Sequence, residues 1–203
     1  MKQSLLIFAK NLVYGQVKTR IAATLGDAVA LTIYGKLLAH TNAVTSNLPV
    51  IKTVCYSSFI EAADVWDNAV YSKQLQSGKD LGARMMNAFA NSFEEANDAV
   101  AVIGTDCFDI SSNLIMDAFA ALTNHDVVIG PAKDGGYYLL AMKQLHPLLF
   151  ENIPWSTNDV LKKTIAICTQ LQLSHFLLEE LSDVDTAHDL TAAQKTMWLK
   201  NSV

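Results

Sequence analysis

The sequence contains little cysteine and no long apolar run, and each shortage excludes a class of protein. Only three of its 203 residues are cysteines, namely Cys55, Cys107 and Cys168. Their number is odd, and no two are spaced like a zinc knuckle or a redox dithiol, so we expect free thiols in a reducing compartment. The longest apolar runs, residues 5–9 and 137–142, are far too short to span a bilayer.

The first apolar stretch does not have the form of an export signal. It ends at Lys10, and no small-residue cleavage site follows it. We therefore expect it to be the first strand of a cytoplasmic protein.

Positive charge is also scarce. The chain has 15 Lys and Arg residues against 20 Asp and Glu residues, which gives a formal net charge of -5. Because a nucleic-acid partner needs a broad basic face that displaces counterions from its phosphates, the charge argues against general nucleic-acid binding. One anionic small molecule, held by a local basic cluster, is compatible with this charge.

Several familiar catalytic signatures are missing. The five histidines have no metal-ligand spacing, no Gly-x-Ser-x-Gly elbow is present, and no glycine-rich loop ends in Gly-Lys-Ser/Thr. Histidine-based chemistry, a serine hydrolase and a Walker-type phosphate loop are therefore not supported.

What the sequence does contain is a regular alternation of strand-like and helix-like segments. Six short apolar segments are expected to be strands: residues 4–9, 50–56, 99–104, 126–130, 137–142 and 173–178. Helical spacing of apolar residues begins at Asp27, recurs after the expected N-cap Asp80, and recurs over residues 114–122. A fourth helix is expected to open at Ser156, which with Asp159 resembles a capping box.

This alternation predicts the α/β class, with a mostly parallel sheet, helices on both of its faces and a single domain over residues 1–203. In such three-layer, Rossmann-like sheets the ligand binds beyond the carboxyl ends of the strands. Residues that directly follow strands are therefore the functional candidates.

A cationic loop follows the first expected strand. Lys10, Lys18 and Arg20 lie close together in sequence, and Gly15 between them permits a tight turn. Lys18 and Arg20 could neutralise phosphate charge, with Arg as a planar two-toothed donor. A solvated surface loop is the alternative.

Acidic residues follow two later strands. Asp106 comes directly after residues 99–104, where a carboxylate is well placed to hold Mg²⁺ or Mn²⁺, whereas Asp109 suits a turn or a helix cap better. Asp134 precedes Gly135 and Gly136, which permit either a hairpin turn or close approach of the backbone to a ligand.

A further pair of carboxylates, Asp183 and Asp185, precedes the last expected helix. Capping of that helix by Asp185 or Thr186 is the simpler alternative to a role in the site.

Six motifs occur in order along the chain, and they are listed here: Val17-Lys18-Thr19-Arg20, Gln76-Ser77-Gly78-Lys79-Asp80-Leu81-Gly82-Ala83-Arg84-Met85, Ile103-Gly104-Thr105-Asp106, residues 128–138, residues 153–157, and Asp183-Val184-Asp185-Thr186 with Asp189-Leu190. Together they resemble a bacterial family of GT-A-like proteins that are regarded as glycosyltransferases of unknown substrate. The resemblance extends from Phe8 to about Leu190. The family belongs to the nucleotide-diphospho-sugar transferase superfamily. It is similar, more distantly, to guanylyltransferases that load 2-phospho-lactate or molybdenum cofactor.

The resemblance implies a GT-A fold and a set of site residues. It implies that Asp106 is the metal aspartate and that Lys18 and Arg20 lie near phosphates. We expect Asp106, Lys18 and Asp134 to be catalytic, and Asp106 with Asp134 or Asp185 to bind Mg²⁺ or Mn²⁺. The residues expected to bind the nucleotide or its phosphates are Phe8, Ala9, Lys10, Lys18, Arg20, Gly78, Arg84, Gly135 and Gly136. Asp134 and Asp185 are both candidates for the general base.

Two departures from the family pattern bear on this expectation. Phe108 stands where many relatives have proline, which could reshape the loop beside the metal. Asn11 and Leu12 stand where relatives often have a proline in the first loop.

Three functions remain open at this point. The first is metal-dependent transfer of a sugar from a nucleotide-sugar to a small-molecule acceptor. The second is nucleotidyl transfer from a nucleoside triphosphate to a small phosphorylated acceptor, which uses the same metal and diphosphate platform. The third is a catalytically silent nucleotide-binding protein, which Phe108 beside the metal position would suit.

Overall fold

The computed structural model describes residues 1–199, so the last four residues of the predicted domain lie outside the described range. Within it, seven strands form one sheet in the order β3-β2-β1-β4-β6-β5-β7. Their bounds are β1 Gln3–Ala9, β2 Ile51–Tyr56, β3 Ser72–Leu75, β4 Ala99–Ile103, β5 Val127–Pro131, β6 Tyr137–Met142 and β7 His175–Leu177. β6 pairs antiparallel with β4 and β5, and the other neighbouring strands pair in parallel. The prediction of a mostly parallel sheet is confirmed.

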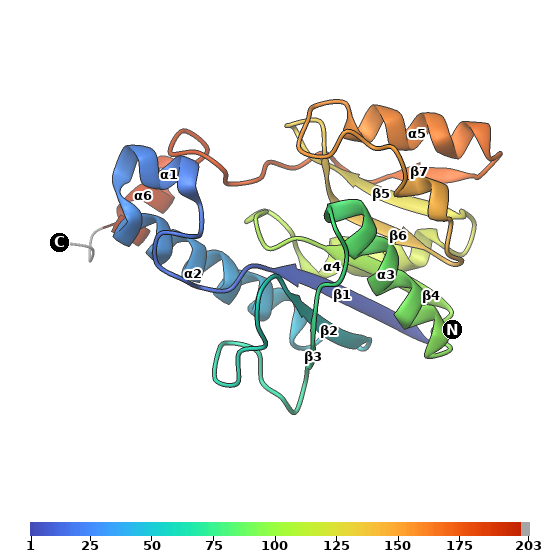
Figure 1. The fold of residues 1–203 in the computed structure, drawn as a ribbon, viewed down its shortest axis with the longest axis horizontal. Helices are drawn as coiled ribbons and strands as arrows, with labels where there is room; N and C mark the ends of the chain where they lie inside the picture. The colour runs from blue at the N-terminus through green and yellow to red at the C-terminus, as the bar shows by residue number, and fades with distance from the viewer. Residues whose placement is uncertain (200–203) are drawn as a thin grey trace.

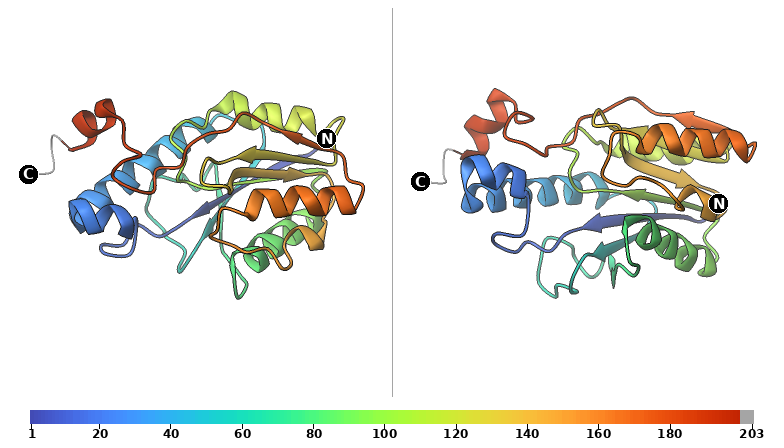
Figure 2. Two further views of the ribbon diagram at one scale, coloured as in Figure 1. Left: turned by 90° about the horizontal axis from the view of Figure 1, so that it is seen from above. Right: turned by 45° about the horizontal axis from the view of Figure 1, so that its top comes forward.

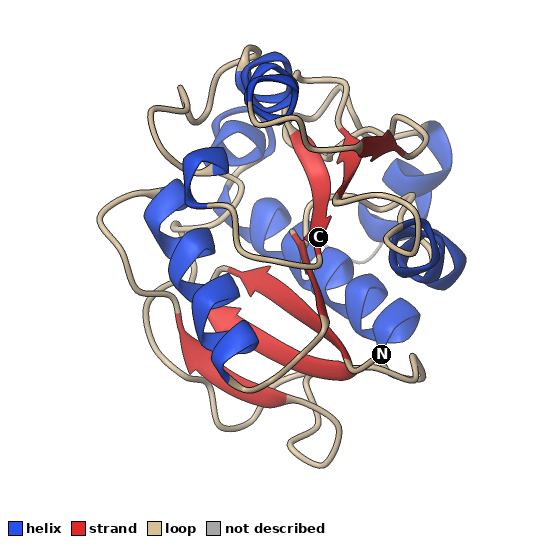
Figure 3. Cartoon of the chain, turned by 90° about the vertical axis from the view of Figure 1, so that its right-hand side faces the viewer, coloured by secondary structure: helices blue, strands red, loops and turns tan. Residues whose placement is uncertain are grey.

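Helices cover both faces of this sheet, as predicted (Figure 3). Their bounds are α1 Thr19–Leu25, α2 Asp27–Thr45, α3 Leu81–Glu94, α4 Ser112–Ala121, α5 Val160–Gln170 and α6 Ala192–Leu199, with a short 3-10 helix at Pro147–Leu149. Alternate strand residues point to opposite faces. Leu5 and Ile7 thus belong to a core with α2 and α4, whereas Leu6 belongs to a second core with α3 and α5.

The helices α1, α6 and the first part of α2 gather at one end of the molecule (Figure 1). This end lies opposite the N-terminus in each further view (Figure 2). It extends beyond the carboxyl ends of the parallel strands, because β1 points toward α2 in Figure 1.

The structure corrects three details of the predicted elements. The polar edge strand β3 was not predicted, because Ser72–Leu75 lacks the apolar signature of a buried strand. The seven-residue helix α1 was not predicted either, so Arg20 lies in a helix rather than a loop. The predicted capping box is wrong: α5 begins at Val160, and Ser156 has a positive φ of 65° outside the helix.

Other local predictions are confirmed. The Asp80 side chain caps α3 by accepting a hydrogen bond from the backbone N–H of Ala83, at 2.8 Å. A helix begins at Asp27, as expected. One of the two alternatives for Asp109 is wrong: the cap of α4 is Ser111, whose hydroxyl accepts the N–H of Leu114, whereas Asp109 lies in the turn before it.

Topology brings distant segments to a single sheet edge. β1, β4 and β5 point in the same direction, because two antiparallel pairings separate β4 from β5. The loop between β5 and β6 therefore opens at the same edge as the residues that follow β1 and β4. The chain after β7 also passes this edge, where Ala132 pairs with Leu181 and Cys107 pairs with Asp183.

Candidate functional site

A cavity of about 660 Å³ lies at this edge of the sheet. Its volume is within the range of roughly 300–1,000 Å³ that is usual for small-molecule sites. Most of the predicted site residues line it, namely Phe8, Ala9, Lys10, Lys18, Arg20, Arg84, Asp106, Asp134, Gly136 and Asp185. The structure therefore brings together residues that are up to 177 positions apart, from Phe8 to Asp185.

The ammonium of Lys18 contacts two carboxylates that line the cavity with it. Its Nζ is 2.8 Å from Asp106 Oδ1 and 3.0 Å from Asp185 Oδ1. The Lys18 side chain is 6% exposed, whereas those of Asp106 and Asp185 are 38% and 37% exposed. The two carboxylates are thus partly open to solvent, whereas the lysine side chain that contacts both of them is buried.

The pKa of Lys18 reflects its contacts with the two carboxylates. Burial alone lowers the pKa of an ammonium, but the carboxylates of Asp106 and Asp185 outweigh burial and raise the pKa of Lys18. The lysine is therefore charged at neutral pH.

The backbone of Lys18 is left-handed, with φ 46° and ψ 47°, at the position just before α1. This conformation is unusual for a residue other than glycine, and it marks the entry of the chain from the loop after β1 into α1.

A hydrogen-bonded segment carries Asp185 to the site. Cys107 pairs with Asp183, and the backbone N–H of Val184 donates to the carbonyl of Asp106 at 2.8 Å. The alternative that Asp185 or Thr186 caps the last helix is wrong, because α6 begins at Ala192. Instead, Asp189 accepts hydrogen bonds from the backbone N–H groups of Asp185 and Thr186, at 3.0 and 2.6 Å.

Asp183 is partly exposed and also lines the cavity beside Asp106 and Asp185, although it was not among the expected catalytic or metal-binding residues. Burial raises its pKa to about 7, and the charges of Asp106, Asp185 and Asp134 act in the same direction. The alternation in Asp183-Val184-Asp185 was the available signal, because alternate residues of an extended segment point to the same side.

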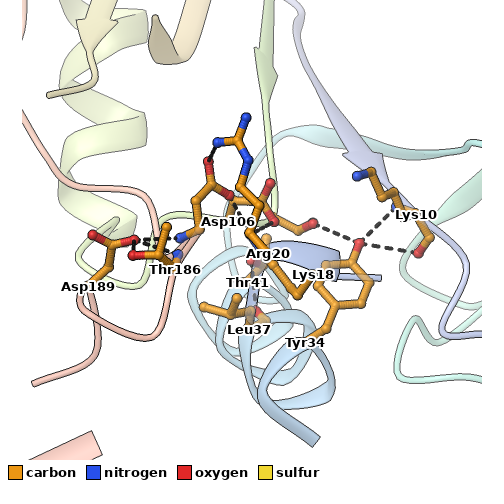
Figure 4. Close-up of polar contacts among 11 residues, drawn as sticks. Lys10, Lys18, Arg20, Tyr34, Leu37, Thr41, Asp106, Thr186 and Asp189 are labelled. Carbon is orange, nitrogen blue, oxygen red and sulfur yellow. Dashed lines mark hydrogen bonds and ion pairs between the residues drawn. The ribbon is translucent and has the colours of Figure 1, made fainter. Parts of the chain in front are cut away.

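Tyr34 is a second residue that the sequence did not reveal. Its hydroxyl accepts from the backbone N–H of Lys10 at 2.8 Å, donates to the Lys10 carbonyl at 3.2 Å, and lies 3.0 Å from Thr105 Oγ1 (Figure 4). It therefore connects the loop after β1 with the residue that precedes Asp106. An aromatic residue on an amphipathic helix such as α2 looks like core in the sequence, and Tyr34 is indeed 1% exposed.

The two predicted arginines lie on different sides of the cavity. Arg20 is open to solvent, with a side chain that is 73% exposed and an Nη1 that is 4.0 Å from Asp185 Oδ2. Arg84, in the first turn of α3, donates from Nε to the Gly78 carbonyl at 3.2 Å. Both guanidinium groups keep further donors for an anionic ligand.

Two predicted glycines are required by packing within the protein and are not part of the cavity lining. Gly78 has φ 144°, and a Cβ there would lie 2.6 Å from the backbone nitrogen of Arg84. Gly135 has φ 89°, and a Cβ there would overlap the Asn158 carbonyl oxygen. Their predicted contact with a ligand stays a prediction.

Gly136 and Asp134 do line the cavity. The loop that contains them joins the antiparallel strands β5 and β6, so it is a hairpin connection as well as part of the site. Asp134 Oδ1 accepts the backbone N–H of Gly136 at 2.8 Å. A Cβ at Gly136 would meet only this carboxylate, at 3.1 Å.

The two departures from the family pattern have local explanations. The ring of Phe108 packs on His40, at a centroid distance of 4.4 Å, and on Trp198, at 4.9 Å. It lies outside the cavity lining. The Asn11 carboxamide holds the loop after β2, since it accepts the N–H groups of Ser58 and Phe59 and donates to the Phe59 carbonyl.

The carboxylates of Asp106 and Asp185 could supply some, but not all, of the ligands of a magnesium-type ion. Among residues 1–199, no three His, Cys, Asp or Glu side chains form a group that could hold a metal ion by itself. Asp106 and Asp185, however, offer two partly exposed carboxylates side by side on Lys18. Mg²⁺ is usually bound by one or two carboxylates, with water and substrate phosphates as its other ligands. This donor set fits such an ion when it arrives with a phosphate.

Comparison with known proteins shows the family of the chain. The family model described as "Uncharacterized protein conserved in bacteria (DUF2064)" matches residues 40–157, which is more than half of the chain. The chain belongs to this family. The predicted family resemblance is thereby confirmed.

Solved structures with similar folds are also known. A candidate nucleotide-diphospho-sugar transferase from Desulfovibrio desulfuricans G20 is 30% identical, with a TM-score of 0.86 over 92% of this chain and 84% of that one. A 4-diphosphocytidyl-2C-methyl-D-erythritol synthase from Anaerococcus prevotii is 12% identical, with a TM-score of 0.59 over 97% and 96% of the two chains. The manganese complex of Rv0371C from Mycobacterium tuberculosis H37Rv is 9% identical, with a TM-score of 0.52 over 99% and 100%.

These similarities confirm the predicted nucleotide-sugar transferase fold of this DUF2064 member. No curated protein matches the chain. In the part of the chain that the structure describes, none of the helices is both long enough and apolar enough to cross a membrane.

Proposed function

We propose that this DUF2064 protein is a metal-dependent transferase that takes a sugar from a nucleotide-sugar and passes it to a small-molecule acceptor. The observation that carries the proposal is the contact of Lys18 with both Asp106 and Asp185 in a cavity at the carboxyl edge of the sheet. The 30% identity to a candidate nucleotide-diphospho-sugar transferase supports the choice of donor.

The roles of the residues follow from their positions. Asp106 and Asp185 would hold Mg²⁺ or Mn²⁺, which would neutralise charge on the diphosphate when bound. Arg20 would donate to phosphate oxygens from the open side of the cavity, where its side chain is 73% exposed. Arg84 would contact a phosphate or the acceptor from the first turn of α3.

The loop between β5 and β6 would face the acceptor. Asp134 is exposed there, and only one of its oxygens is needed for the turn that binds the N–H of Gly136. Asp185 would instead hold the metal ion together with Asp106. We therefore favour Asp134 over Asp185 as the base that accepts the proton of an acceptor hydroxyl.

The burial of the three thiols supports a reducing compartment. Cys55, Cys107 and Cys168 are all free and buried. Disulfides are rare in the cytoplasm because its thiols are kept reduced. We propose the cytoplasm as the site of action.

A donor screen tests the function. Nucleotides and nucleotide-sugars would be ranked by thermal shift with and without Mn²⁺, since a ligand at a hundred times its dissociation constant stabilises by about 2.7 kcal/mol. Candidate donors would then be incubated with pooled small-molecule acceptors, and the release of nucleoside diphosphate and of pyrophosphate would be measured.

The products distinguish the three functions. Release of nucleoside diphosphate from a sugar donor supports the proposal. Release of pyrophosphate from a nucleoside triphosphate would replace it with nucleotidyl transfer. Tight binding without either product would favour a binding protein, although Phe108, which suggested that alternative, packs on His40 and Trp198 instead.

A further inference from the structure

Lys18 lies where a cation held jointly by Asp106 and Asp185 would have to lie. One nitrogen atom is in contact with an oxygen of each carboxylate, at 2.8 and 3.0 Å. The ammonium therefore already neutralises part of the charge that would attract a metal ion. We propose that Lys18 is the resident cation of this site, and that a divalent ion binds there strongly only after phosphate has drawn the ammonium away.

Electrostatics gives the direction of this effect. A divalent ion that entered beside the ammonium would be repelled by a like charge a few ångströms away, in a place from which water is partly excluded. It would also find one oxygen of each carboxylate already occupied. Metal binding without phosphate should therefore be weak in the wild-type protein.

Lys18 shares the cavity with the groups between which its ammonium would move. Lys18 has a long side chain with freely rotating donors, and it lines the same cavity as Arg20, Asp106 and Asp185. A diphosphate in the cavity offers the ammonium new anionic partners, so the two carboxylates become available to the metal ion. Phosphate and metal would consequently assist one another's binding, as coupled ligands must do reciprocally.

This inference rests on the proposed function for the presence of the diphosphate, but its test does not. The decisive variant is Lys18→Met, and its probe is Mn²⁺ alone, followed by the loss of the free-ion signal in electron paramagnetic resonance. We expect the variant to bind Mn²⁺ at least about tenfold more tightly than the wild type, because a nearby like charge has been removed. A loosened fold would not produce such a gain.

Two further variants make the comparison specific. Lys73→Met removes another buried lysine of an ion pair, since Lys73 Nζ is 2.9 Å from Asp64 Oδ1 and its side chain is 7% exposed. It should leave Mn²⁺ affinity unchanged, because Lys73 is outside the cavity lining. Adding Asp106→Asn to Lys18→Met should abolish the gain.

A glycine variant guards against a folding defect. Lys18→Gly suits the backbone φ of 46°, which glycine adopts without strain, and it should also show tighter Mn²⁺ binding. Equal or weaker Mn²⁺ binding by the folded Lys18 variants than by the wild type would overturn the inference, as would a gain that survives Asp106→Asn. Failure of the donor screen alone would reject the proposed function and leave a gain in Mn²⁺ affinity intact.

Discussion

The carboxylate of Asp189 fixes the backbone at Asp185, because Asp189 Oδ2 accepts the N–H of Asp185 at 3.0 Å. The same oxygen accepts the N–H and the hydroxyl of Thr186, at 2.6 and 2.9 Å (Figure 4). This turn holds Asp185 against Lys18. Asp189 is thus a positioning residue for the site, although it lies outside the cavity lining.

Replacing Asp189 should therefore weaken ligand binding without direct contact with the ligand. In Asp189→Ala, the freed N–H groups of Asp185 and Thr186 lose charged hydrogen bonds that are each worth about 1.5–3 kcal/mol. Calorimetry should show weaker nucleoside diphosphate binding in Mn²⁺, while binding of the bare nucleoside is retained. Unchanged diphosphate affinity in the folded variant would show that this turn does not position Asp185.

The paired glycines should differ when each is changed to alanine. Gly135→Ala should lower the free energy of unfolding by more than about 1 kcal/mol, because a left-handed φ is costly for alanine and its Cβ would meet the Asn158 backbone. Gly136→Ala should fold nearly normally, since its Cβ would meet only the Asp134 carboxylate.

We expect Gly136→Ala to lose ligand affinity, because its methyl group would project at the cavity lining beside Asp134. Urea unfolding and calorimetry measured in parallel would separate the two effects. Normal ligand binding by Gly136→Ala would show that this segment is only a hairpin turn and does not contact the ligand.

Arg20 should distinguish a phosphate from the rest of the nucleotide. Its exposed guanidinium is not needed for packing, so Arg20→Ala should remain stable. We expect a roughly tenfold to hundredfold loss of affinity for a diphosphate, from one charged hydrogen bond of about 1.5–3 kcal/mol. Parallel titrations with nucleoside and nucleoside diphosphate check this, and equal losses for both would reject a phosphate contact.

A pH effect is expected away from the site, at Asp126. Hydrogen bonds from the hydroxyl and backbone N–H of Ser174 lower the pKa of Asp126, and Lys143 acts in the same direction. A carboxyl whose pKa is depressed on folding stabilises the fold above its unfolded pKa, and this contribution is lost as the pH falls through its folded pKa.

The comparison with Asp126→Asn isolates that contribution. The wild type should be more stable than the variant at pH 6, and the difference should shrink as the pH falls below about 4, the ordinary range for Asp. Urea unfolding of both proteins at each pH measures the difference. A gap that stays constant down to pH 3 would exclude this linkage.

The sequence predicted the layers of the fold well because burial leaves a clear pattern. β4 is buried along its whole length, and its apolar run Ala99–Ile103 was recognised directly. β3 was missed because an edge strand exposes polar side chains and depends on its pairing with β2 rather than on burial. The capping box at Ser156 was a wrong prediction because it used only local sequence. In the structure, Ser156 lies in a loop whose neighbouring residues pack against Gly135 and Gly82.

The site was predictable in its residues but not in their contacts. Asp106 could be selected because it follows a buried strand, and Lys18 because it belongs to the cationic loop after the first strand. That Lys18 would be buried between Asp106 and Asp185 depends on tertiary structure that joins residues 167 positions apart. Tyr34 carried no signal, since the partners of its hydroxyl are backbone atoms of Lys10 and the side chain of Thr105.

In the proposed function, Asp106 holds the cation through which the diphosphate binds. The most direct measurement is calorimetric titration of Asp106→Asn with the nucleoside diphosphate that shifts the wild-type melting temperature most, in the presence and absence of Mn²⁺. We expect Mn²⁺ to strengthen binding to the wild type and to have no effect on binding to the folded variant. An equal Mn²⁺-dependent gain in affinity for both proteins would contradict it.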